Sequence, residues 1–128
     1  MKTFQIDGRF SVVVPNDWVI EIGQVTSFYE PENGSGALQF SFYVTEDEAV
    51  ASVVELLQEF LEDRFKNAGI VINQGYAYFE GIDAKDHFWR YWAFTKADVA
   101  AFVTYNCEKN DQFKEYDTIN NIMTSVFF

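Results

Sequence analysis

The sequence predicts an α+β domain in which an antiparallel sheet of about six or seven strands lies between two helices (an α/β/α sandwich). Three observations lead to this prediction. Short stretches of alternating apolar residues are separated by turn residues, a long stretch with helical periodicity follows in mid-chain, and a second one ends the chain. With 128 residues, 48% of them hydrophobic, the chain is expected to form a single domain over 1–128 with its own core.

The first half of the chain contains four predicted strands. They cover residues 10–14, 18–22, 25–30 and 37–44. The last of them, "ALQFSFYV", alternates apolar and polar side chains, which is typical of a strand with one buried face. Because the turns between them are short and rich in Pro, Gly and Asn, we expect these strands to form an antiparallel meander.

The stretch from about 47 to 68 predicts the first helix. Its apolar residues recur at helical spacing; they are Val50, Val53, Val54, Leu57, Phe60, Leu61, Phe65 and Ala68. Thr45 and Glu48 have the spacing of a capping box, and Gly69 is a common residue just beyond the end of a helix.

Three further strands and a helix complete the order ββββ-α-βββ-α. The strands are predicted at 70–79, 86–95 and 99–107, and the helix at about 111–125. The apolar side of this helix is predicted to consist of Phe113, Tyr116, Ile119, Ile122 (or Met123) and Val126.

The segment 86–94, "DHFWRYWAF", contains five aromatic residues, and both of its alternating rows are largely apolar. A strand of this kind is covered on both faces, so we expect one helix on each side of the sheet. The aromatic residues predicted to be mostly buried are Trp89, Tyr91, Trp92, Phe94 and Phe102. A stacking platform for nucleic acid would need interleaved basic residues, and Arg90 alone does not supply them.

Short stretches of the sequence resemble the PsbP/Mog-like superfamily, and more narrowly its small bacterial single-domain members. These stretches are "FSVVVPNDW" at 10–18, "GALQFS" at 36–41 and "IMTSVFF" at 122–128. The resemblance implies an α/β/α sandwich with a non-enzymatic adaptor role, and it implies that Pro15 and Trp18 shape a first hairpin. Plant members bind a photosynthetic complex and Mog-type members bind a small GTPase. No partner-binding motif of either branch is present, so neither partner carries over.

The charge is unevenly distributed along the chain. The net charge is −11, and no Lys or Arg occurs between Arg9 and Arg64. This stretch holds 11 of the 20 acidic residues, whereas the rest of the chain has as many acidic as basic residues. The electrostatic field of such a negatively charged protein repels nucleic acids and anionic membranes and attracts basic proteins. The sequence therefore predicts a basic protein partner, with solubility as the alternative reason for the charge.

Four acidic residues are predicted to form the partner-binding surface. Glu55, Glu59, Glu62 and Asp63 lie at i, i+4, i+7 and i+8, on the side of the first helix opposite its apolar stripe. Charge complementarity accelerates association, so an immunity-type protein that inhibits a basic toxin or enzyme is a specific version of this hypothesis.

The alternative hypothesis is a small-molecule binder or enzyme that uses His87 and Cys107. If strands 86–95 and 99–107 form a hairpin centred on Ala97, the two side chains face each other, and the imidazole can activate the thiol. A shift of one residue would separate them, and a buried structural cysteine is the more common case.

The chain lacks the motifs of the common cofactor-dependent enzymes. One His and one Cys cannot form a zinc site, and no phosphate-binding or nucleophile-elbow motif occurs. We therefore expect no cofactor, no metal and no enzyme activity. The longest uncharged runs, 33–45 and 67–79, are shorter than the ~18 residues of a membrane span, and the N-terminus lacks the apolar core of a signal peptide. A cytoplasmic location is expected.

Overall fold

The computed structural model describes residues 1–6, 8, 10–44, 53–61, 64–65, 69–73, 76–96 and 99–126. The elements within these residues are, in chain order, β1 (Lys2–Ile6), β2 (Phe10–Val14), β3 (Val19–Ile22), β4 (Thr26–Tyr29), β5 (Gly36–Val44), α1 (Val53–Leu61), β6 (Val71–Asn73), β7 (Tyr76–Ile82), β8 (His87–Lys96), β9 (Val99–Glu108), the 3-10 helix η1 (Lys109–Asp111) and α2 (Tyr116–Thr124).

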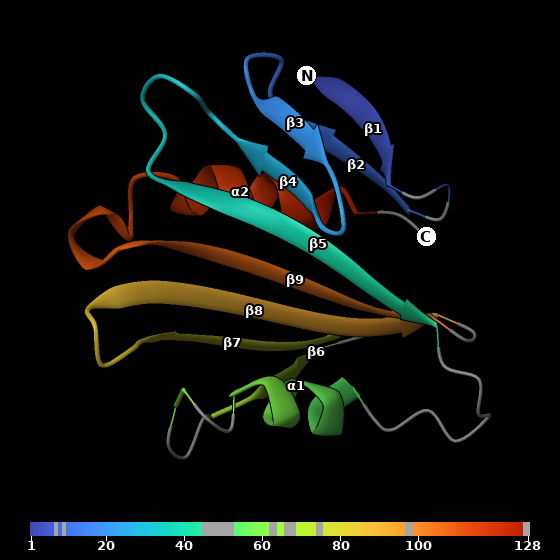
Figure 1. Ribbon diagram of the computed structural model, residues 1–128, viewed down its shortest axis with the longest axis vertical. Coiled ribbons are helices and arrows are strands. Elements are labelled where there is room, and N and C mark those ends of the chain that lie inside the picture. The colour runs from blue at the N-terminus through green and yellow to red at the C-terminus, as the bar shows by residue number, and fades with distance from the viewer. Residues whose placement is uncertain are drawn as a thin grey trace.

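Seven of these strands form one sheet in the order β3-β4-β5-β9-β8-β7-β6, with antiparallel neighbours throughout (Figure 1). The two remaining strands, β1 and β2, form a separate antiparallel pair. The predicted α+β class, with an antiparallel sheet and two helices, is confirmed.

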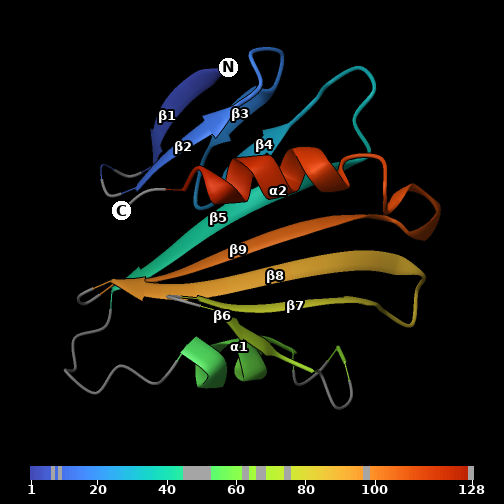
Figure 2. The same ribbon diagram turned by 180° about the vertical axis from the view of Figure 1, so that it is seen from behind.

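One face of the large sheet is covered by α2 together with the β1–β2 pair, which lie on the same side in Figure 2. Ile119 and Ile122 of α2 are fully buried against this face, and Val12 and Val14 of β2 belong to the same core. Ser125, just after α2, accepts a hydrogen bond from the backbone of Val13 at 2.8 Å. These contacts join the C-terminal helix to the N-terminal strands.

The opposite face of the sheet is covered by α1 (Figures 1 and 2). Leu57 and Leu61 of α1 pack with Tyr91, Ala93 and Phe102 in a second, smaller core. β8 and β9 are therefore covered on both faces, which explains why both of their alternating rows are apolar. Of the five aromatic residues expected to be buried, four are at most 5% exposed, whereas Trp89 is partly exposed.

The N-terminal strands depart from the predicted meander. β2 pairs with β1, Phe10 opposite Ile6, and it makes no pair with β3, so only β3, β4 and β5 form a meander. The backbone N–H of Trp18 donates to the carbonyl of Pro15 at 3.1 Å, and this turn leads the chain from one sheet to the other. The hairpin that the resemblance implied for Pro15 and Trp18 is therefore wrong. The missed strand β1 leads into Gly8, whose φ of +65° favours glycine.

Both helices are shorter than predicted within the described residues. Arg64 lies in a turn and Phe65 outside any helix, so the first helix does not continue to residue 68. α2 begins at Tyr116 rather than near 111, and Phe113, which was expected on its buried side, is 75% exposed. The predicted strand 70–79 corresponds to β6 and β7, and β7 continues to Ile82. Residues 45–52, including the predicted capping box, lie outside the described residues.

Candidate functional site

α1 carries the described part of the predicted partner-binding surface. While Leu57 and Leu61 face the sheet, Glu55 and Glu59 are exposed one helical turn apart. The ring of Phe60 is 41% exposed beside them and packs on Phe102 with a centroid distance of 4.2 Å. We call Glu55, Glu59 and Phe60 the acidic α1 surface. The other two residues of the predicted column, Glu62 and Asp63, lie outside the described residues.

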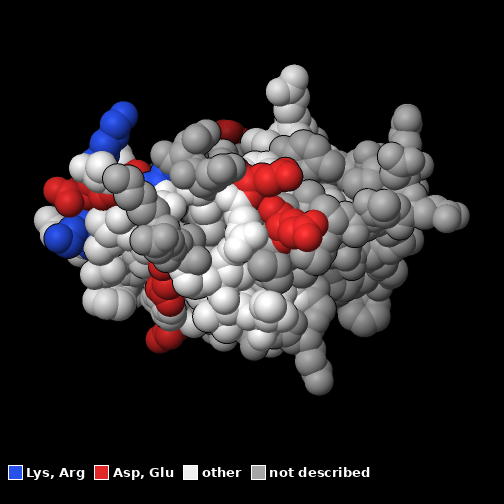
Figure 3. All heavy atoms as spheres, turned by 90° about the horizontal axis from the view of Figure 1, so that it is seen from below, with Lys and Arg blue, Asp and Glu red and all other residues white. Residues whose placement is uncertain are grey.

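Figure 3 views this side of the molecule directly, with acidic residues in red and basic residues in blue. Described acidic atoms lie near the middle of this face and also at the end where the described basic atoms gather. The middle of the face carries no described basic atoms in this view, in agreement with the sequence, in which residues 10–63 contain no Lys or Arg. That the acidic α1 surface binds a partner stays a prediction at this point.

The predicted proximity of His87 and Cys107 is wrong. The register places His87 opposite Glu108 and Cys107 opposite Phe88, one residue away from the pairing assumed for a hairpin centred on Ala97. Because neighbouring residues in a strand point to opposite faces, Cys107 is buried on the α2 side while His87 lies on the α1 side. The ring nitrogen Nε2 of His87 is instead 3.9 Å from the Glu108 carboxylate.

The environment of Cys107 also argues against a role as a nucleophile. Burial raises the pKa of the thiol above its ordinary value, and a hydrogen bond with Tyr105 offsets this only in part. A raised pKa means less thiolate at a given pH, and thiolate is the reactive species.

We therefore expect Cys107 in the folded protein to react with iodoacetamide more slowly than a free thiol at about pH 7. Denaturation in urea should raise the rate, because it removes the burial that disfavours the thiolate. The His87→Ala variant should react at the wild-type rate, since the two side chains lie on opposite faces. Fast labelling of the native protein that depends on His87 would contradict this assignment.

Arg90 is the buried cation of the aromatic segment 86–94, and it is only 3% exposed. Its Nε donates to the Tyr78 hydroxyl at 2.8 Å, its Nη1 to the Tyr116 carbonyl at 3.4 Å, and its Nη2 to Oδ1 of Asn120. The guanidinium carbon also lies 4.1 Å from the ring centroid of Tyr116 and 4.7 Å from that of Trp92.

These contacts show what the aromatic residues on the α2 side of β8 do. They enclose a side chain of the protein itself, and cation–π contacts and hydrogen bonds together offset the cost of burying its charge. Because Arg90 contacts β7 and α2, it fastens this helix to the sheet. The segment is core on this face rather than a stacking platform for nucleic acid.

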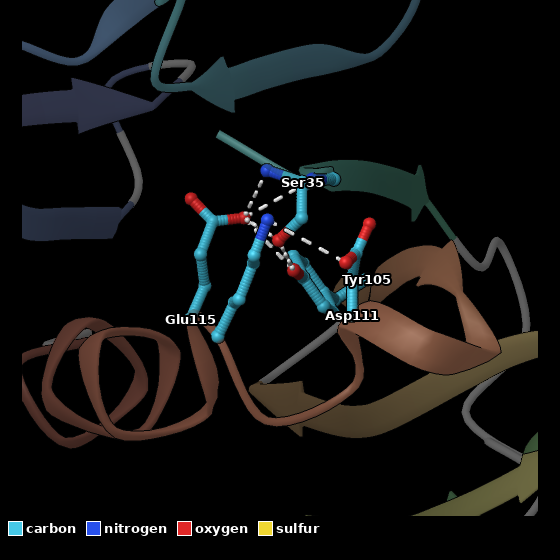
Figure 4. A network of polar contacts seen from close by, with 6 residues as sticks. Ser35, Tyr105, Asp111 and Glu115 are labelled. Atoms are coloured by element: carbon cyan, nitrogen blue, oxygen red, sulfur yellow. Dashed lines mark hydrogen bonds and ion pairs between the residues drawn. The ribbon is translucent and has the colours of Figure 1, made fainter. Parts of the chain in front are cut away.

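A second buried polar network surrounds Glu115, the residue before α2 (Figure 4). Its Oε1 accepts hydrogen bonds from the backbone nitrogens of Ser35 at 3.1 Å and Gly36 at 3.0 Å, from Ser35 Oγ at 3.0 Å and from the Tyr105 hydroxyl at 2.9 Å. Burial raises the pKa of Tyr105, which keeps this hydroxyl protonated as a donor. A Cβ at Gly36 would collide with the carbonyl oxygen of Asn106, so glycine is required there.

The Glu115 network connects three parts of the fold that are distant in sequence. The donors lie at the start of β5 and on β9, and the acceptor lies just before α2. All four donors converge on one carboxylate oxygen, so the arrangement fixes the chain rather than leaving an open acid for catalysis. Sequence reasoning missed Glu115, since nothing local distinguishes it from the other acidic residues.

The described part of the chain contains no group of three or more His, Cys, Asp or Glu residues placed to hold a metal ion. Neither of the two helices, as far as they are described, has the length and apolar character of a membrane-spanning helix.

No protein-family model matches the chain, and no curated protein matches it. Among solved structures, it is similar to a protein from Bacteroides thetaiotaomicron VPI-5482, with 20% sequence identity and a TM-score of 0.68. The match covers 98% of this chain, which spans only about half (47%) of the Bacteroides protein.

The chain is also similar to cyanobacterial PsbP (CyanoP) from Synechocystis sp. PCC 6803. Here the TM-score is 0.68 and the identity 10%, and the match covers 98% of this chain and 91% of the CyanoP chain. At such low identities the similarity shows the fold alone. The fold is PsbP-like, which confirms this part of the resemblance found in the sequence.

Proposed function

We propose that the chain is a non-enzymatic protein-interaction domain that binds a basic protein through the acidic α1 surface. The observation that supports this most is the composition of that surface. Glu55 and Glu59 are exposed one helical turn apart beside Phe60. The ring of Phe60 is 41% exposed and packs on the buried ring of Phe102. An aromatic anchor within a charged rim is a common composition of binding surfaces between proteins.

Electrostatics favour a basic partner over other classes of macromolecule. The chain has a net charge of −11, and its basic residues are absent from the stretch that contains α1. A field of this sign attracts a basic protein and accelerates encounter, whereas it repels phosphate backbones and anionic lipid. A basic toxin or enzyme is one such partner, in which case the chain would be an immunity-type inhibitor.

The PsbP-like fold supports an adaptor role, because the sequence resemblance associates this fold with non-enzymatic members. Within that resemblance we propose a small bacterial single-domain member of the PsbP/Mog-like superfamily that acts in the cytoplasm. Neither a photosynthetic complex nor a GTPase is proposed as the partner, since the sequence carries no binding motif of either branch.

The proposal is tested by reversing the charge of the acidic α1 surface. A partner is first isolated from the native host with the wild-type protein, purified, and used for association kinetics at two ionic strengths. The Glu55→Lys/Glu59→Lys variant should associate about tenfold more slowly at low salt, with a smaller effect at high salt, because steering is screened. Its stability in urea should stay within about 0.5 kcal/mol of wild type.

The matched control is the Asp17→Lys/Glu32→Lys variant. It changes the net charge by the same amount, and its two sites are exposed in turns before β3 and before β5, away from α1. If the control slows association as much as the α1 variant, the effect comes from net charge alone. If neither variant changes the rate, the acidic α1 surface does not bind this partner. Either result would overturn the proposal.

A further inference from the structure

A pocket of about 410 Å³ lies where β7 turns into β8. It is lined by Arg64, Asp83, Ala84, Lys85, His87 and Trp89. These residues come from the turn after α1, from the β7–β8 turn and from the start of β8. The pocket lies on the α1 side of the sheet, and it contains none of the residues of the acidic α1 surface.

Asp83 fixes the shape of this pocket. One carboxylate oxygen accepts hydrogen bonds from the backbone nitrogens of Lys85 at 2.9 Å and His87 at 3.0 Å, and the other accepts from the indole N–H of Trp89 at 2.9 Å. These bonds, that from the His87 backbone above all, hold the pKa of Asp83 below its ordinary value. These donors thus compensate the negative charge of Asp83, and the bond to the indole holds the Trp89 ring in one orientation.

Arg64 lies over the ring that Asp83 orients. Its guanidinium carbon is 4.8 Å from the Trp89 ring centroid, and its Nη1 donates to the Tyr91 hydroxyl at 3.2 Å. A guanidinium has five N–H donors, and the described contacts of Arg64 use one of them. The contact with Tyr91 holds the side chain in place, and a guanidinium fork is suited to binding an oxyanion in a bidentate manner.

Basic side chains outnumber carboxylates in the lining of this pocket. Arg64, Lys85 and His87, the only histidine of the chain, line it together with a single carboxylate, that of Asp83. Two other acidic residues are close: Asp86 is exposed in the same turn, and Glu108 is 3.9 Å from His87. Neither lines the pocket. In Figure 3 the described basic atoms gather at one end of the α1 side, where described acidic atoms also lie.

We propose that this pocket binds a small organic anion. Its carboxylate or phosphate group would be held by Arg64, Lys85 and His87. Its apolar part would lie along the edge of the Trp89 ring, because Arg64 lies over this ring and Tyr91 stacks on it. The head group would be recognised by charge-assisted hydrogen bonds. Because Asp83 already orients the Trp89 ring in the free protein, binding would lose less conformational entropy. The site is independent of the proposed protein partner, because it uses different residues.

The test is a titration of the ¹⁵N-labelled protein, in which the indole N–H signal of Trp89 reports on the pocket. Benzoate and phenyl phosphate are the anionic probes, benzyl alcohol is the neutral analogue, and inorganic phosphate tests the head group alone. At least one organic anion should shift this signal in a saturable manner with a Kd of about 1 mM or below, and benzyl alcohol should bind at least tenfold more weakly. The stronger of the two anions identifies the preferred head group.

The variants Arg64→Gln and Lys85→Gln should each raise this Kd about tenfold, because each removes one cationic ligand of the head group. Lys114→Gln is the matched control, since Lys114 pairs with Asp111 outside the pocket at 3.5 Å, and its Kd should be unchanged. Retained spectra of all three variants establish that they are folded. Equal affinity for benzyl alcohol, wild-type affinity in both pocket variants, or no saturable shift with either organic anion would overturn the proposal.

Discussion

Replacing Trp92 by alanine is expected to lower the free energy of unfolding by about 3–5 kcal/mol. Trp92 is 5% exposed and lies on β8, with Tyr78 on the neighbouring strand at a centroid distance of 5.3 Å. The substitution leaves a cavity that neighbouring strands cannot fill, since they are fixed in the sheet. It also removes one of the rings that contact the Arg90 guanidinium, so the buried charge loses part of its compensation.

Urea denaturation measures this effect as a shift of the midpoint with an unchanged slope. Phe113→Ala is the control, because this ring is 75% exposed and its removal should change stability by less than about 0.5 kcal/mol. Should the Trp92 and Phe113 variants be equally stable, the α2 side of β8 is not the core that the structure shows.

Replacing Glu115 by alanine is expected to cost about 3 kcal/mol, although the residue lies in a loop. The change leaves the backbone nitrogens of Ser35 and Gly36 and the hydroxyl of Tyr105 without their acceptor in a site that is only 9% exposed. Each buried donor without a partner costs about 1–3 kcal/mol, and Ser35 is close enough to the surface for water to replace part of the loss.

Two further variants separate the network from the mere loss of a negative charge. Glu115→Gln keeps an oxygen acceptor at the same place and should cost less than Glu115→Ala in the same urea measurement. Asp117→Ala removes an exposed carboxylate in the first turn of α2 and should cost less than about 0.5 kcal/mol. A Glu115→Ala variant as stable as Asp117→Ala would show that the network contributes nothing to stability.

The sequence by itself determined the features that depend on the order of neighbouring residues. The helical spacing of Leu57 and Leu61 predicted both the existence of α1 and its buried side, and the same spacing placed Glu55 and Glu59 in solvent. Apolar residues in both rows of 86–94 predicted a strand covered on both faces, and the two helices do cover these faces. Periodicity of this kind arises within one element, so it needs no knowledge of the other elements.

The tertiary structure decided which strands pair and in which register. The pattern "KTFQI" of β1 alternates like a strand, but its pairing with β2, and not of β2 with β3, depends on tertiary packing. β2 contacts α2, and Phe4 of β1 packs on Phe28 of β4 with a centroid distance of 5.9 Å. The register of β8 and β9 placed Cys107 beside Phe88 rather than His87. A shift of one residue moves each side chain to the other face, and alternation along a single strand cannot fix the position of its partner strand.

The polar networks and the pocket were likewise decided by the tertiary structure alone. Glu115 binds Ser35 across 80 positions of the chain, Arg90 reaches Asn120 across 30, and Arg64 reaches Tyr91 across 27. No local pattern in the sequence predicts these contacts, since a hydrogen bond or a cation–π contact depends on distance in space. These side chains come within reach of one another only after the sheet and both helices have packed. The pocket where β7 turns into β8 forms in the same way.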